Sequence, residues 1–247
     1  MITKIIAHRG DTSYGPENTL SAFRAALKNG ARAIELDVHS TKDGILIVHH
    51  DYYLGNPDNG EGIIYERDYA YITTLHINNI EKIPTLEEVF SLIGNKLHYE
   101  IELKGLTEEF LVNVAALVKK YNLSSYIEFT SPIAYNLTRI KELEPSFKTG
   151  TFVAALPAWM DKKLGQKIAI NNALLGNIDV LHCPLSLIDS DFIQTAHEEG
   201  LLIHAADCDT EVELQEAFNM NVDQLSTNKL SLAIDIRAQK RVILRIV

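Results

Sequence analysis

Two histidines and two carboxylates stand at the ends of apolar, strand-like runs near the start of the chain. His8 follows the first of these runs, and Glu35 and Asp37 alternate with apolar residues in the second. Alternate residues of a strand point to the same face, so Glu35 and Asp37 are expected to lie side by side. Such a pair is tolerated when a cation or a hydrogen-bonded network lies between the carboxylates. His50, after a further apolar run, adds a second imidazole, and two imidazoles can supply an acid and a base near neutral pH.

A later strand-like segment repeats the pattern of alternating charges. Glu100, Glu102 and Lys104 share one face of this segment, and Ile101 and Leu103 share the other. Charged side chains directed into a barrel have no place in a purely structural core. One glutamate of this segment, added to the two carboxylates of the earlier strand, would complete a set of three hard oxygen ligands. Such a set suits Mg²⁺ or Ca²⁺ better than Zn²⁺.

The cations next to these groups suggest that the substrate is an anionic ester. Arg9 carries planar donors that suit a phosphate, and Lys104 could contact the same phosphate. The metal and the two cations would neutralise the charge that develops at phosphorus. His8 and His50 would lie on opposite sides, one activating the nucleophile and one protonating the leaving alkoxide. The residues do not say which histidine takes which role.

The overall composition limits the possible partners and the compartment. The chain has 247 residues, 46% of them hydrophobic, and a net charge of −10. An acidic protein repels polyanions at long range, which argues against nucleic acid and against docking on anionic lipid. Met1 is followed so soon by His8 that there is no room for a signal peptide, and no apolar run reaches membrane-spanning length. We therefore expect a cytoplasmic protein that acts on a small molecule, without a membrane anchor.

Strand-like and helical segments alternate along the whole chain. The predicted strands are residues 4–7, 32–38, 97–103, 126–130, 149–153, 179–182, 201–205 and 222–226. Capping boxes at Thr85-x-x-Glu88 and Thr210-x-x-Glu213 predict two of the intervening helix starts. Eight strand–helix units in a chain of this length predict one (β/α)8 TIM barrel domain over residues 1–247. A doubly wound open sheet is the alternative. The barrel is favoured because the charged residues fall near the ends of strands, where barrel active sites lie.

Residues 51–82 interrupt the alternation. This stretch has weak periodicity and is rich in Gly, Pro, Asn and Tyr. It is too long for an ordinary loop, so we expect an insertion after the second strand that lies over the site.

The motifs of the first half of the chain occur in the order seen in glycerophosphodiester phosphodiesterases. They are His8-Arg9-Gly10, Pro16-Glu17-Asn18-Thr19-Leu20, Glu35-Leu36-Asp37-Val38, Thr41-Lys42-Asp43-Gly44, His50-Asp51, Ile83-Pro84-Thr85-Leu86-Glu87-Glu88-Val89 and Glu102-Leu103-Lys104. The chain thus resembles a family of (β/α)8 barrels with a small insertion after the second strand. Its members hydrolyse glycerophosphodiesters to sn-glycerol 3-phosphate and an alcohol, using one divalent cation, usually Mg²⁺ or Ca²⁺.

The resemblance also implies roles for individual residues. His8 and His50 would be the acid–base pair, and Arg9 and Lys104 would contact phosphate. The metal ligands would be Glu35, Asp37 and Glu102. Glu100 faces the same way as Glu102, and from this position we expect it to hydrogen-bond a neighbour rather than to ligate the metal through water.

The second half of the chain departs from the family pattern. The usual Trp-Thr pair near the seventh strand is absent, and the usual Thr-Asp of the eighth strand is Thr227-Asn228. Two rival functions therefore stay open. One is a phosphodiesterase that resembles lysophospholipase D, and the other is a weakly catalytic barrel that binds a phosphoester.

Overall fold

The fold is a closed parallel barrel, seen in a computed structural model that describes residues 3–243, with side chains for residues 3–240. The barrel strands are β1 (Lys4–Ala7), β2 (Ala33–Ser40), β8 (His98–Leu103), β9 (Ile127–Thr130), β10 (Lys148–Phe152), β11 (Val180–Pro184), β12 (Leu202–Ala206) and β13 (Gln224–Thr227). Each pairs with the next in parallel, and β1 pairs with both β2 and β13, which closes the barrel. The predicted TIM barrel is therefore confirmed, and the open-sheet alternative is wrong.

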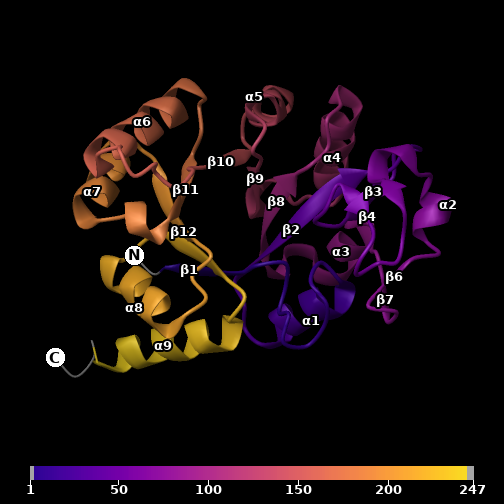
Figure 1. The fold of residues 1–247 in the computed structure, drawn as a ribbon, viewed down its shortest axis with the longest axis horizontal. Helices are drawn as coiled ribbons and strands as arrows, with labels where there is room; N and C mark the ends of the chain where they lie inside the picture. The colour runs from indigo at the N-terminus through magenta and orange to yellow at the C-terminus, as the bar shows by residue number, and fades with distance from the viewer. Residues whose placement is uncertain (1–2, 244–247) are drawn as a thin grey trace.

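Helices follow the strands and lie on the outside of the barrel (Figure 1). They are α1 (Leu20–Lys28), α3 (Leu86–Ile93), α4 (Glu108–Lys120), α5 (Ala134–Leu143), α6 (Lys162–Leu175), α7 (Ser190–Glu198), α8 (Glu211–Met220) and α9 (Leu230–Ile243). Short 3-10 turns are η2 (Gly94–Lys96), η3 (Ser124–Tyr126) and η4 (Leu185–Leu187). Both predicted capping boxes form, at Thr85 with Glu88 and at Thr210 with Glu213, so local chemistry sets the starts of α3 and α8.

The second strand is longer than its sequence pattern predicts. It continues to Ser40 because β3 (Leu46–Val48) folds back and pairs with residues 38–40 in antiparallel register. This return brings the chain from the end of β2 to His50 at the same end of the barrel. The pairing of β2 with β3 therefore positions the second histidine relative to the carboxylates of β2.

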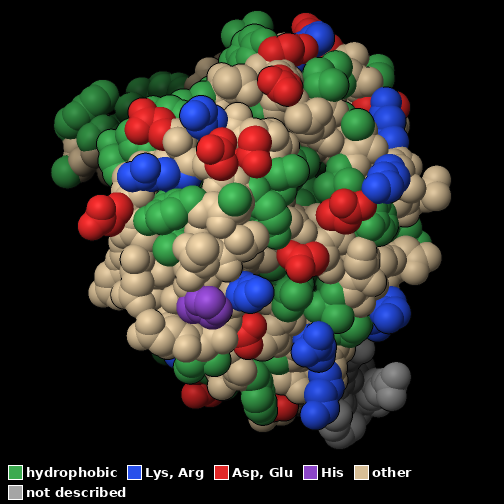
Figure 2. Space-filling view, turned by 90° about the vertical axis from the view of Figure 1, so that its right-hand side faces the viewer, with side chains coloured by type: hydrophobic (Ala, Val, Ile, Leu, Met, Phe, Trp, Pro, Cys, Tyr) green, Lys and Arg blue, Asp and Glu red, His purple; other side chains and the backbone are tan. Residues whose placement is uncertain are grey.

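The segment that follows β3 has its own small apolar cluster. It contains the hairpins β4 (Tyr53–Leu54) with β5 (Gly62–Ile63) and β6 (His76–Ile77) with β7 (Glu81–Lys82), together with η1 (Ile64–Glu66) and α2 (Tyr69–Ile72). The cluster consists of Ile47, Leu54, Ile64, Ile72, Leu75, Ile77 and Ile83. Figure 2 views the molecule from the side that carries this segment, where acidic and basic side chains are interspersed. The organisation of residues 1–247 as one domain with this insertion stays a prediction.

Among the described residues, no helix combines the length and the apolar character needed to cross a membrane.

Candidate active site

The carboxylates of two adjacent strands converge at the C-terminal end of the barrel. In the parallel pairing of β2 with β8, Asp37 lies opposite Glu102, and Glu35 lies opposite Glu100. Oxygen atoms of Glu35, Asp37 and Glu102 all lie within 4.8 Å of one another. The structure thus brings together the three predicted metal ligands, and it places Glu100 in a different group of side chains.

The donor set fits a hard divalent cation. Glu35 and Asp37 are buried, and Asp37 Oδ1 accepts no hydrogen bond. Burial and the nearby carboxylates of Asp37, Glu100 and Glu102 raise the pKa of Glu35 well above its ordinary value. Burial also raises the pKa of Glu102, and Asp37 adds to the effect. Three carboxylates at this distance repel one another, and a bound cation would relieve the repulsion. Carboxylate oxygens are also the ligands that Mg²⁺ and Ca²⁺ prefer.

Lys104 compensates part of this negative charge. Its Nζ lies 2.7 Å from Glu102 Oε1 and 3.2 Å from Asp37 Oδ1. Burial opposes the charged forms of Lys104, Asp37 and Glu102, but the ion pairs outweigh burial at Lys104 and Asp37. They raise the pKa of Lys104 and lower the pKa of Asp37, with help from Asn18 and Arg9. The lysine predicted to contact phosphate therefore lies against the carboxylates themselves.

Arg9 has an unusual backbone conformation that ties it to the same carboxylates. Its φ of 54° is in the left-handed region, which costs energy for a residue with a side chain. Its main-chain N–H donates to Glu35 Oε2 over 2.8 Å, and its guanidinium donates to Glu17 Oε1 over 2.8 Å. Asn18, also with positive φ, donates to Asp37 Oδ2 over 2.8 Å. The Arg9–Asn18 loop thus orients both carboxylates of β2.

His8 is held by a residue of the last strand–helix loop. Its Nδ1 lies 3.0 Å from Asn228 Oδ1, and its Nε2 lies 3.8 Å from Glu35 Oε2. Asn228 Nδ2 donates to Asp209 Oδ2 over 2.7 Å, which fixes the orientation of the amide. Because the amide oxygen can only accept, His8 must carry its proton on Nδ1. Its Nε2 is therefore the nitrogen directed at the carboxylate side of the site.

His50 is oriented in a similar way by its neighbour. Its Nδ1 lies 2.7 Å from Asp51 Oδ1, and this hydrogen bond fixes the orientation of the ring. Its positive form lowers the pKa of Asp37 and opposes the rise at Glu102, so it lies within electrostatic reach of both. Each predicted histidine therefore has Nδ1 hydrogen-bonded to a side-chain oxygen.

A cavity of about 580 Å³ lies beside Lys104, between the inserted segment and the loop that leads into α4. Lys104 is part of its wall, which also includes Tyr52 and Tyr65 from the inserted segment, Leu106 from the loop before α4, and Phe110 from the first turn of α4. Tyr65 and Leu106 are exposed apolar groups at this cavity. Through Lys104 this partly apolar cavity borders the site.

Sequence reasoning missed the Asp209–Asn228 pair. Asn228 is 220 residues from His8 in the chain, and only closure of the barrel brings the two together. The signal in the sequence was the change from the family's usual Thr-Asp to Thr227-Asn228.

Comparison with known proteins agrees with this architecture. The profile of the glycerophosphoryl diester phosphodiesterase family matches residues 8–232. A glycerophosphodiester phosphodiesterase of Caldanaerobacter subterraneus is 40% identical over 61% of this chain, and the match spans 66% of that relative, just under two thirds. One from Bacillus subtilis is 26% identical over 90% of this chain and 82% of its own length.

A solved structure shows the same fold. It is an Oleispira antarctica phosphodiesterase in complex with the product sn-glycerol-3-phosphate, with a TM-score of 0.82 and 26% identity over 95% of this chain and 97% of the other. Because the family profile covers most of the chain, the chain belongs to the glycerophosphoryl diester phosphodiesterase family of enzymes.

Proposed function

We propose that this protein hydrolyses glycerophosphodiesters to sn-glycerol 3-phosphate and an alcohol, using one divalent cation and two histidines. The observation that carries the proposal is the convergence of Glu35, Asp37 and Glu102 beside an imidazole, His8, whose Nε2 faces them. The product named for the Oleispira antarctica structure supports the same substrate class. The carboxylates lie at the end of the barrel where TIM-barrel enzymes carry out their chemistry.

Glu35, Asp37 and Glu102 would hold the cation, Mg²⁺ or Ca²⁺. Asp37 Oδ1 is buried and has no hydrogen bond beyond its ion-pair contact with Lys104, so it is available to bind such an ion. When bound, the cation supplies stabilisation of the negative charge on the phosphoryl oxygens. Arg9 and Lys104, whose pKa values the same carboxylates raise, would contact the phosphate from either side of the cluster.

The two histidines would move the protons. Asn228 holds the Nδ1 proton of His8, and Asp51 bonds Nδ1 of His50, so Nε2 is the nitrogen of each ring that is left to exchange a proton with the substrate. One ring would accept the proton of the attacking hydroxyl, and the other would donate a proton to the departing alkoxide. The nucleophile is either water or the neighbouring hydroxyl of the glycerol moiety.

The cavity beside Lys104 favours one alternative, hydrolysis of a lysophospholipid. Tyr65 and Leu106 give the cavity an exposed apolar border, on which an acyl chain could lie. The net charge of −10 disfavours an anionic lipid surface as the site of action. The cytoplasmic location and the absence of nucleic-acid partners stay predictions.

The test is product release from a panel of substrates. Glycerophosphocholine, glycerophosphoethanolamine and glycerophosphoglycerol are each incubated with the protein and Mg²⁺ or Ca²⁺, and sn-glycerol 3-phosphate is measured with a coupled assay. We expect release from at least one of the three. Choline release from lysophosphatidylcholine alone would favour the alternative. Binding of glycerol 3-phosphate without turnover of any substrate would indicate a phosphoester-binding barrel.

A further inference from the structure

A second group of carboxylate and imidazole side chains lies inside the barrel, below the active site. It consists of Glu100 on β8, Glu128 on β9, His182 on β11 and His204 on β12, and all four are buried. One ligand atom from each lies within 4.8 Å of the others. Strand pairing sets Glu100 opposite Glu128 and His182 opposite His204, so the closed barrel brings the four together.

His204 points into this group without a hydrogen-bond partner. Its side chain has no exposed surface, and neither Nδ1 nor Nε2 makes a hydrogen bond. Glu100 Oε2 is also buried and unpartnered. A buried imidazole usually has a partner for at least one nitrogen, because burying an unsatisfied polar atom is costly. These atoms therefore point to a ligand between them.

The distances around Glu100 match two ligands on one ion better than a hydrogen bond. Glu100 Oε1 lies 3.4 Å from His182 Nδ1, and Oε2 lies 3.5 Å from His204 Nδ1. Ligand bonds of about 2.0–2.2 Å in a tetrahedral zinc site place neighbouring ligand atoms roughly 3.4 Å apart. The distance from each imidazole Nδ1 to the nearest Glu100 oxygen is therefore about the distance between two ligand atoms of one cation.

The fourth member, Glu128, orients His182 from the other side of the ring. His182 Nε2 lies 2.7 Å from Glu128 Oε1, and Gln224 Nε2 donates to both Glu128 oxygens over 3.0 and 2.9 Å. A carboxylate that accepts the second N–H of a metal-bound histidine is a common arrangement around metal ions. It leaves Nδ1 of His182 free to bind an ion.

The charge of the cluster also suits a dication. With both imidazoles neutral, as metal binding requires, the two carboxylates give −2 formally, and Lys4 in the cavity wall offsets one of these charges. Without an ion, burial opposes the charged form of His182, but Glu100 and Glu128 outweigh burial and raise its pKa, so an ion would displace a proton from this ring. Burial and the neighbouring His182 lower the pKa of His204 well below its ordinary value, so this ring is in the neutral form that binds metals.

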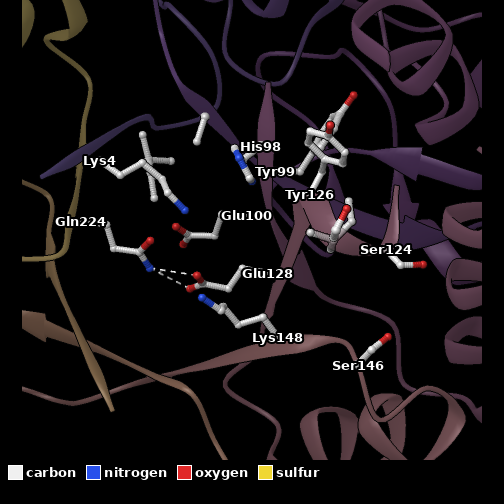
Figure 3. A pocket seen from close by; sticks show the side chains of 14 residues that line it. Lys4, His98, Tyr99, Glu100, Ser124, Tyr126, Glu128, Ser146, Lys148 and Gln224 are labelled. Carbon is white, nitrogen blue, oxygen red and sulfur yellow. Dashed lines mark hydrogen bonds between the residues drawn. The ribbon is translucent and has the colours of Figure 1, made fainter. Parts of the chain in front are cut away.

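An ion could reach the cluster from the end of the barrel opposite to the active site. A cavity of about 160 Å³ lies there, at the start of the strands, and Glu100 and Glu128 are part of its wall. Figure 3 shows both carboxylates, with Lys4 and Lys148, pointing toward a common centre.

We propose that Glu100, His182 and His204 bind a second divalent cation inside the barrel, of the class that prefers imidazole and carboxylate ligands, with Zn²⁺ as the probe. The ion links β8, β11 and β12 and is separate from the cation of the active site. It would stabilise the barrel rather than take part in hydrolysis.

The test uses a protein whose first site has been disabled. In a Glu35→Gln/Glu102→Gln variant, two of the three active-site ligands are removed while the interior cluster is intact. After treatment with EDTA and dialysis, Zn²⁺ is titrated by calorimetry, and bound zinc is counted by mass spectrometry. We expect one equivalent of Zn²⁺ and a rise in the unfolding temperature of several degrees. No binding by this variant would overturn the proposal.

Two further substitutions in the same background locate the bound ion. His204→Gln should lose the bound zinc and the rise in unfolding temperature. His98→Gln should retain both, because His98 lines the same cavity but lies outside the cluster. Zinc binding that persists in His204→Gln, or is lost in His98→Gln, would contradict the assignment. If His204→Gln does not fold, Glu100→Gln, which keeps the side-chain shape, decides the same question.

Discussion

Asn228 accepts a hydrogen bond from Nδ1 of His8 while its amide nitrogen donates to Asp209. This relationship joins the last strand–helix loop to the first and sets which nitrogen of His8 faces the carboxylates. Asn228 is a positioning residue, because it acts on the reaction through His8.

Replacing Asn228 by Ala should allow the proton of the neutral His8 ring to lie on either nitrogen. Loss of one hydrogen bond of roughly 1 kcal/mol predicts a decrease in kcat of about fivefold, with little change in the unfolding temperature. The ¹⁵N chemical shifts of the His8 ring report the tautomer directly. They should show a proton on Nδ1 in the wild type and a mixture in the variant. An unchanged tautomer with a lower kcat would mean that Asn228 acts in another way.

The two histidines should each be needed for turnover. His8→Ala and His50→Ala should each lower kcat by at least roughly 10²-fold, because each removes a proton-transfer group. His76→Ala in the β6 hairpin is the matched control and should keep the wild-type rate. A variant of His8 or His50 with full kcat would remove that residue from the mechanism.

The buried carboxyl group of Glu35 should lower the free energy of unfolding of the metal-free protein, although hydrolysis requires it. Its pKa is raised by burial and by Asp37, so above about pH 4.5 the folded state resists an ionisation that the unfolded chain undergoes freely. In EDTA at pH 7.5, Glu35→Gln should therefore raise the unfolding temperature and abolish hydrolysis. The gain should disappear near pH 4, where the unfolded carboxyl also holds its proton. A lower unfolding temperature at pH 7.5 would show that Glu35 stabilises the fold.

The His49–Asp58 pair should make the insertion pH-dependent. His49 Nδ1 faces the Asp51 carbonyl and Nε2 lies 2.9 Å from Asp58 Oδ2, so both nitrogens must donate and the ring is charged. Burial opposes this charge, but Asp58 outweighs it and raises the pKa of His49 above 6.5. The stabilisation is full below that value and is lost as the pH rises through the folded-state pKa.

Asp58→Asn removes the charge but keeps an oxygen for the Gly55 and Gly60 N–H groups. It should lower the unfolding temperature more at pH 6 than at pH 9, with a loss of about 1–3 kcal/mol at pH 6. Differential scanning calorimetry at the two pH values measures this difference. Equal losses at both values would show that His49 is neutral in the folded protein.

The sequence predicts those features that depend on neighbours in the chain. Apolar runs located all eight barrel strands, and alternation along β2 correctly placed Glu35 and Asp37 on one face. The choice of Glu102 over Glu100 needed the family resemblance, because alternation alone puts both on the same face. The structure separates them along the strand. Oxygen atoms of Glu102 lie close to those of Glu35 and Asp37, whereas Glu100 lies closer to the start of the strand and groups with Glu128, His182 and His204.

Contacts across the barrel could not be predicted in this way. Gln224 meets Glu128 and Asn228 meets His8 only after the last strand pairs with the first. Nothing in the sequence spacing indicates that His182 and His204 both face Glu100. Register and closure, which arise from the whole sheet, decide such contacts.

Metal reconstitution tests the central claim most directly. The protein is treated with EDTA and dialysed, and release of sn-glycerol 3-phosphate from a glycerophosphodiester that it hydrolyses is measured as Mg²⁺ or Ca²⁺ is added back. We predict that activity is absent in EDTA and returns in a saturable way in the wild type. It should not return in Glu35→Gln at the same metal concentrations. Full activity of the wild type in EDTA, or of Glu35→Gln with metal, would contradict a catalytic cation held by Glu35, Asp37 and Glu102.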